Sequence, residues 1–227
     1  MADKIRLFYN IVQHSIQFLS LIYSVIYWKE IKMSNLKLFP LYIAISFLIC
    51  LSWYFRNLNL PGIAAQNIFI IFESLIIYDF YIRIFNGKHN RQILVFLFII
   101  FLILFIVISA QVYKTQNMYN NFFLLFRHRV LTEVFVIQSI IIVLPVLFYY
   151  KSLFNPPFIR DLRKNPIFLV NTGILFCFTI TIPLFALTNV FMQYNRDLFV
   201  YLFMINSFSY IIMHLFFIKA FSQLAHA

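Results

Sequence analysis

Seven apolar stretches, each about the length of a transmembrane helix, occupy most of this 227-residue chain. A helix needs about 20 mostly apolar residues to cross a hydrocarbon core of about 30 Å, because lipid offers no partner for a free backbone polar group. The stretches predict an all-α bundle of seven transmembrane helices that forms a single domain over residues 1–227. They cover approximately residues 9–28, 39–55, 63–85, 93–111, 130–150, 165–190 and 198–221.

The composition supports a membrane protein and excludes other classes. Hydrophobic residues make up 63% of the chain and charged residues 11%, whereas soluble domains are about 45–50% apolar and about 25% charged. In a soluble protein the net charge of +11 would suggest nucleic-acid binding. Here most basic residues lie near the ends of the apolar stretches, where they orient helices and meet anionic headgroups, so we expect no nucleic-acid partner.

The distribution of Lys and Arg predicts the orientation of the bundle. Basic residues concentrate on the cytoplasmic side of membrane proteins. Eleven of the 18 Lys and Arg residues lie at or after the ends of the first, third, fifth and seventh stretches. The sequence therefore predicts an external N-terminus and a cytoplasmic C-terminus.

Polar residues recur at helical spacing in three of the predicted helices. Residues three and four apart lie on one face of a helix, and polar side chains in a membrane avoid lipid. The three faces contain Gln17 in the first stretch, Gln66 and Glu73 in the third, and Asn206, Tyr210 and His214 in the seventh. They predict a polar bundle interior; the alternative is that these residues only bond across helix interfaces, for about 0.6 kcal/mol each.

Glu73 lies near the middle of the third stretch, where a charged side chain costs at least about 2.5–3.5 kcal/mol. Desolvation favours the neutral acid, so we expect a protonated carboxyl that donates a hydrogen bond. In a purely structural alternative, this carboxyl is bonded to Gln66, Gln17 or Tyr210.

Glu133 and His214 are the other two titratable residues of interest inside the stretches. Glu133 lies one turn inside the fifth stretch, near the predicted external surface, and His214 lies near the middle of the seventh. If the helices adjoin, both residues border a cavity with Glu73 that opens outward. The alternatives are a Glu133 wetted by headgroups and a His214 that is a neutral core residue.

The sequence lacks the patterns of several kinds of chemistry. None of the 3 Gly residues adjoins a Ser, which excludes a rhomboid-type serine protease. No His, Cys or carboxylate set has the spacing of a zinc site, so we expect neither metal nor cofactor. A composite metal site of Glu73, Glu133 and His214 is the alternative.

Several short runs occur together in the third, fifth and sixth stretches. They are Asn67-Ile68 with Glu73 ahead of Tyr78, the run from Glu133 to Tyr149-Tyr150-Lys151, Lys164-Asn165-Pro166-Ile167-Phe168, and Asn171-Thr172-Gly173-Ile174-Leu175. This pattern resembles a family of short seven-helix membrane proteins from Bacteroidota. The resemblance implies a seven-helix fold and a link to membrane signalling.

Together these features favour a non-enzymatic sensor or receptor in a bacterial inner membrane. We expect a small polar or amphiphilic ligand in the outward-facing half, and a signalling partner at the cytoplasmic loops, chiefly residues 155–164. The candidate ligand-binding residues are Gln17, Gln66, Glu73, Glu133, Asn206, Tyr210 and His214. The alternatives are a small proton-coupled carrier that uses Glu73 and an intramembrane lipid-modifying enzyme that uses Glu73 and His214.

Overall fold

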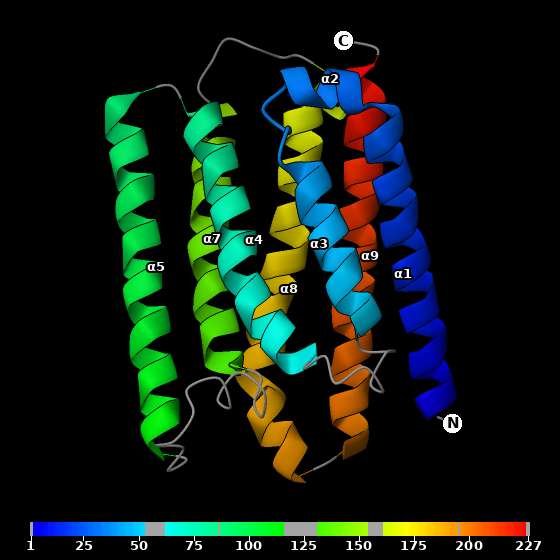
Figure 1. The fold of residues 1–227 in the computed structure, drawn as a ribbon, viewed down its shortest axis with the longest axis vertical. Helices are drawn as coiled ribbons and strands as arrows, with labels where there is room; N and C mark the ends of the chain where they lie inside the picture. Colours follow the sequence, from blue (N-terminus) through cyan, green and yellow to red (C-terminus); the bar gives the residue numbers. More distant parts are fainter. Residues whose placement is uncertain are drawn as a thin grey trace.

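The computed structural model describes residues 2–52, 62–85, 87–115, 131–153, 161–194 and 196–225 (Figure 1). Over these residues each of the seven predicted stretches is mainly helical, and residues 53–55 and 130 of the predicted stretches lie outside the described part. Over these residues the chain is all-helical, with eight α-helices, one 3-10 helix and no strand. The elements are α1 (Ala2–Ile26), α2 (Trp28–Met33), α3 (Phe39–Ser52), α4 (Gly62–Ile84), α5 (Lys88–Thr115), α7 (Thr132–Leu153), η2 (Leu162–Lys164), α8 (Pro166–Tyr194) and α9 (Arg196–Leu224).

The helices other than α2 and η2 stand side by side and alternate in direction along the chain, so the two termini lie at opposite ends of the bundle (Figure 1). Helices that follow one another in the chain pack together from α1 to α9, and α9 packs back against α1. α4 also packs against α7, across this ring. This arrangement turns the polar faces of helices that are distant in sequence toward a common interior.

Four of the described helices are long and apolar enough to cross a membrane. These segments are Lys88–Gln111 of α5, Thr132–Leu153 of α7, Pro166–Thr188 of α8 and Tyr201–Leu224 of α9. α3 contributes a shorter apolar segment, Phe39–Leu51. The finding supports the membrane class that the sequence predicts.

The outer surface of the bundle is apolar, as lipid contact requires. α5 stands at the edge of the bundle (Figure 1), and Phe96, Ile103 and Ile106 on this helix are exposed. Leu48 on α3 and Phe148 on α7 are exposed as well. The exposed apolar side chains of α5 at the edge of the bundle suit a surface that meets lipid.

The helix boundaries differ from the predicted ones where hydropathy gives no signal. The prediction for residues 93–111 misses the first turn of α5, which begins at Lys88, because polar residues extend a helix without adding to its hydropathy. The short helix α2 was not predicted either. It forms because Ile31 is fully buried while its polar neighbours stay outside, and the backbone N–H of Ser34 closes it by donating to the Ile31 carbonyl at 3.0 Å.

An aromatic cluster fills the interior between α3, α4 and α9. The ring centroid of Phe39 lies 5.1 Å from that of Phe80 and 5.2 Å from that of Phe217. Tyr42 lies one turn further along α3, with its ring centroid 6.1 Å from that of Phe217. This packing fixes the Tyr42 ring, so that its hydroxyl points toward α4.

Candidate functional site

Glu73 lies at the midpoint of α4 and is fully buried. Its two carboxyl oxygens are bound from two other helices. The hydroxyl of Tyr42 on α3 donates to Oε1 at 2.9 Å, and the side-chain amide of Gln138 on α7 donates to Oε2 at 2.9 Å. We call these three residues the Glu73 cluster; all are 0–1% exposed.

The amide of Gln138 is oriented by three acceptors. Besides the carboxyl of Glu73, its Nε2 lies 3.1 Å from the carbonyl oxygen of Ile70 and 3.1 Å from the hydroxyl of Ser74. Its Oε1 is buried and finds no hydrogen-bond partner among the described residues. An amide rotated by half a turn would place its oxygen against the carbonyl oxygen of Ile70, so the geometry assigns the amide nitrogen to this position and leaves Oε1 as the unpaired atom.

The cluster accommodates either protonation state of Glu73. A carboxylate accepts from both Tyr42 and Gln138, whereas a protonated carboxyl can donate from Oε1 to the tyrosine oxygen, since a phenol both donates and accepts. The amide of Gln138 has to donate in both cases. Gain or loss of a proton therefore reverses one hydrogen bond, between α3 and α4, and leaves the other in place.

Further polar contacts join α4 to its neighbours along its length. The side chain of Asn67 accepts from the backbone N–H of Leu131, directly before α7, at 3.2 Å. The hydroxyl of Tyr78 donates to the carbonyl of Ile141 on α7 at 3.1 Å. Tyr81 donates to Asn171 of α8 at 2.6 Å. These polar residues of α4 thus face the interior and hold α4 against α7 and α8.

The polar face of α9 approaches the Glu73 cluster. Tyr210, which is partly buried, lies close enough to Glu73 and Tyr42 for electrostatic interaction. His214, one turn further, is fully buried, and neither ring nitrogen has a hydrogen-bond partner among the described residues. Its ring centroid lies 5.6 Å from that of Phe217, which in turn contacts Tyr42. The ring of Phe217 thus connects His214 to Tyr42 of the cluster.

The remaining predicted site residues lie on α1, α4, α7 and α9. Gln17 is fully buried and donates to Ser46 of α3 at 3.3 Å. Gln66 and Asn206 are partly buried, and Oδ1 of Asn206 has no hydrogen-bond partner within the described part of the chain. Glu133 is partly buried and accepts from the adjacent Thr132 hydroxyl at 3.2 Å.

Glu133 faces a different direction from the α7 residue that binds Glu73. It precedes Gln138 by five residues, which places the two about 140° apart around a helix of 3.6 residues per turn. Gln138 points at α4. The sequence predicts that Glu73 and Glu133 border the same cavity. The packing of α7 on α4 does not by itself place them so.

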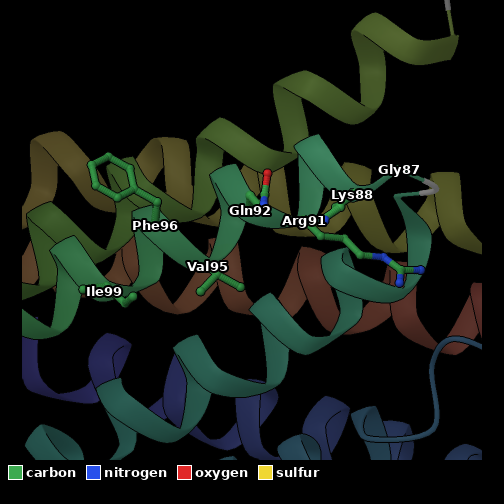
Figure 2. Close-up of a pocket in the computed structure, with 7 residues that line it drawn as sticks. All are labelled: Gly87, Lys88, Arg91, Gln92, Val95, Phe96 and Ile99. Carbon is green, nitrogen blue, oxygen red and sulfur yellow. The ribbon is translucent and has the colours of Figure 1, made fainter.

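Two cavities among the described residues differ greatly in size. A cavity of about 10 Å³ between α8 and α9 is lined by residues that include Asn206 and Thr188. A groove of about 670 Å³ runs along the first turns of α5, at the opposite end of the bundle (Figure 2). Glu73 lines neither of them.

Tyr42 and Gln138 are the two site residues that sequence reasoning missed. The partners considered for Glu73 were Gln66, Gln17 and Tyr210, and the two hydrogen-bonded partners in the structure are others. A glutamine inside an otherwise apolar stretch is the signal that would have indicated Gln138, because such a residue avoids lipid. Tyr42 gives no comparable signal, since tyrosine is common throughout this chain, with 14 copies.

No protein-family model, curated protein or solved structure matches the chain. Within the described residues, no group of three or more His, Cys, Asp or Glu residues is placed to hold a metal ion. Function therefore has to be inferred from the polar groups and their geometry.

Proposed function

We propose that this chain is a receptor-like protein that crosses a bacterial inner membrane seven times, and that the Glu73 cluster is its responding element. A proton or a small ligand with a cationic or hydrogen-bonding group would act from the outward-facing half of the bundle. The cytoplasmic loops would pass the change to a partner. Of these loops, residues 154–160 lie outside the described part of the chain.

The observation that carries this proposal is the position of Glu73 between three helices. Its carboxyl bonds to Tyr42 on α3 and to Gln138 on α7, and all three side chains are buried. A change in the charge of this carboxyl reverses its hydrogen bond with Tyr42, and the low local dielectric makes such a change energetically large. In this proposal the packing of α3 against α4 responds to the state of one side chain while the bond to α7 is kept, and such coupling is what a conformational switch requires.

Two unpaired acceptors favour a ligand with hydrogen-bond donors. They are Oε1 of Gln138 and Oδ1 of Asn206, both buried and without a partner among the described residues. The partly buried Gln66 is in the first turns of α4 and Asn206 in the first half of α9, and both helices begin at the end of the bundle that carries the N-terminus (Figure 1). By the predicted orientation this end faces outward, so a donor-bearing ligand would approach Glu73 from the outside.

A proton-coupled carrier is the second candidate, and the ability of the cluster to hold either protonation state of Glu73 favours it. A carrier and a receptor differ in net transport. Reconstituted vesicles with a pH-sensitive dye inside should show no substrate-driven proton uptake if the protein is a receptor. Turnover of a labelled phospholipid would instead identify the third possibility, a lipid-modifying enzyme.

The receptor proposal is tested by Glu73→Gln. Gln keeps the size and hydrogen bonding of the side chain but cannot be ionised, so we expect folding and insertion to be preserved and the response to pH to be lost. The response is measured as the change between pH 8 and pH 5 in the distance between spin labels at the exposed positions Lys29 on α2 and Lys151 on α7. The protein is held in lipid nanodiscs, in a background without native cysteines.

Glu133→Gln is the matched control for this experiment, because it makes the same chemical change at the partly buried acid of α7. We expect this variant to respond as the wild type does. A Glu73→Gln protein with the full wild-type distance change would contradict the proposal. Equal loss in both variants would show that the response is a general effect of acidic residues.

The proposed orientation makes a prediction of its own. A fluorescent reporter fused after Ala227 should be active in the cytoplasm, while a periplasmic phosphatase inserted between residues 57 and 62 should be active outside. A pair of reporters exchanged between the two positions should be inactive at both. The opposite pattern would place the half of the bundle with Gln66 and Asn206 on the cytoplasmic side.

A further inference from the structure

The groove of about 670 Å³ on α5 combines a basic end with an apolar floor. The described residues that line it are Gly87, Lys88, Arg91, Gln92, Val95, Phe96 and Ile99, and all of them are exposed. Figure 2 shows the side chains of Lys88 and Arg91 beside the turn at Gly87, and those of Phe96 and Ile99 further along the helix. The groove is therefore polar at the end of the bundle and apolar toward its middle.

The order of residues on α5 produces this gradient. Lys88, Gln92 and Phe96 follow at four-residue steps, and so do Arg91, Val95 and Ile99 in the neighbouring row. Each row begins with a basic residue and ends with a large apolar one, and such steps keep side chains on one face of a helix. The face thus changes from cationic to apolar along the helix axis.

Both basic residues remain available to an anion. Neither Lys88 nor Arg91 forms an ion pair with any residue that the structure describes. Arg91 donates from Nε to the backbone carbonyl of Phe85 at 3.3 Å, which orients the guanidinium and leaves its terminal nitrogens for another acceptor. The nearby Arg83, by contrast, is paired with Asp79 at 2.7 Å.

We infer that this groove binds an anionic phospholipid, with its phosphate at Lys88 and Arg91 and an acyl chain along Val95, Phe96 and Ile99. Lys88 and Ile99 are separated by about 16 Å along a helix that rises 1.5 Å per residue. This separation matches the depth of one leaflet of a hydrocarbon core of about 30 Å. A water-soluble phosphate would satisfy the two cations but would leave the apolar floor of the groove exposed.

The inference rests on the membrane location of α5, whose segment Lys88–Gln111 is one of the four candidate spans. It does not depend on the Glu73 cluster. Lipid binding should therefore be unchanged in Glu73→Gln, and either proposal can fail without the other.

The test measures lipid binding to the purified full-length chain in a neutral detergent, by native mass spectrometry with added phosphatidylglycerol or phosphatidylcholine. Each basic side chain near an anionic headgroup contributes about fivefold in affinity. We therefore expect Lys88→Gln combined with Arg91→Gln to weaken phosphatidylglycerol binding by roughly 10- to 30-fold. Binding of phosphatidylcholine should change little.

The matched control is Lys29→Gln combined with Lys32→Gln on α2. Both lysines are exposed and lie at the same end of the bundle, so this variant loses the same charge without touching the groove (Figure 1). We expect less than about a twofold change in phosphatidylglycerol binding, since its basic groove is intact. A loss as large as that of the groove variant would overturn the proposal, because it would show a general effect of positive charge.

The apolar half of the groove is tested by Ile99→Ala against Ile106→Ala. Both isoleucines are exposed on α5, at 47% and 64%, but only Ile99 lines the groove. Weaker lipid retention in Ile99→Ala alone would support the acyl-chain position, and equal behaviour of the two variants would contradict it. A further outcome is that millimolar inorganic phosphate competes for the groove as strongly as phosphatidylglycerol does. That result would show a site for anions in general and would also overturn the lipid assignment.

Arg91→Gln removes the hydrogen bond to Phe85. If it lowers thermal stability for that reason, the affinity for phosphatidylglycerol is measured with Lys88→Gln alone. Lys88 is exposed and makes no side-chain hydrogen bond to a described residue. This single variant should still weaken phosphatidylglycerol binding by about fivefold. An unchanged affinity would contradict a contact between Lys88 and the headgroup.

Discussion

Glu73→Leu is expected to lower the stability of the folded protein by about 2–4 kcal/mol, while Glu73→Gln stays within about 1 kcal/mol of the wild type. Leucine removes both acceptors, so the buried hydroxyl of Tyr42 loses its hydrogen-bond partner and Gln138 loses one of three. Glutamine can accept from Gln138 with its oxygen and donate to Tyr42 with its amide. Thermal unfolding in detergent, followed by circular dichroism, measures the difference.

Tyr42→Phe provides the control for this prediction. It removes the hydroxyl that Glu73→Leu leaves unpaired, and it changes nothing else in the aromatic cluster. Removing both members of a buried pair is nearly neutral, whereas removing one leaves the other desolvated. The Tyr42→Phe, Glu73→Leu double variant should therefore be more stable than Glu73→Leu alone, with a coupling of about 1–3 kcal/mol.

The same set of variants separates a structural role of the carboxyl from a functional one. A Glu73→Leu protein as stable as the wild type would contradict a structural role of these hydrogen bonds. A stable Glu73→Gln protein that has lost its pH response would show a function beyond structure. Both results together would mean that the ionisation of Glu73, and not its hydrogen bonding, is what the protein requires.

The helices and the burial of Glu73 were predictable because each depends on local sequence. An apolar run of about 20 residues has few stable conformations in lipid other than a helix. Likewise, Asn67, Ser74 and Tyr78 share an arc of α4 through helical periodicity alone, and the structure places all three in the interior. That seven helices cross the membrane stays a prediction, which the four candidate spans support in part.

The partners of Glu73 were not predictable because they depend on how the helices pack. Tyr42 is 31 residues away in sequence and Gln138 is 65 residues away. Hydropathy and periodicity indicate which face of a helix turns inward, but they do not indicate which faces meet. The packing of α4 against α7, across the ring, brings Gln138 to Glu73.

The groove on α5 was missed for a different reason. Lys88 and Arg91 were interpreted only as orienting charges between two spans, because they precede the predicted stretch 93–111. The helix begins at Lys88, so the face that carries Phe96 extends back to Lys88 and Arg91. A helix boundary placed five residues too late thus concealed an amphiphilic surface.

Gly173→Leu is expected to destabilise the protein by about 3 kcal/mol or more, because a larger side chain has no room at this position. A Cβ at this position would lie 3.0 Å from Cβ of Phe216 and 3.2 Å from the backbone oxygen of Met213. Small residues at such points let membrane helices approach closely. A leucine would force α8 and α9 apart along an extensive contact, and heating in detergent followed by size-exclusion chromatography should detect the loss.

The atoms that surround Gly173 decide how this effect can be reversed. Phe216→Ala should not rescue Gly173→Leu, because alanine retains the Cβ and the backbone of Met213 does not change. Gly173→Ala should cost less, since its smaller clash is offset by a helix propensity about 0.8–1.0 kcal/mol better than that of glycine. Ala186→Leu is the matched control, as Ala186 is exposed on the same helix and should tolerate the larger side chain. Equal melting of Gly173→Leu and Ala186→Leu would show that α8 and α9 do not approach each other as closely as the structure has them.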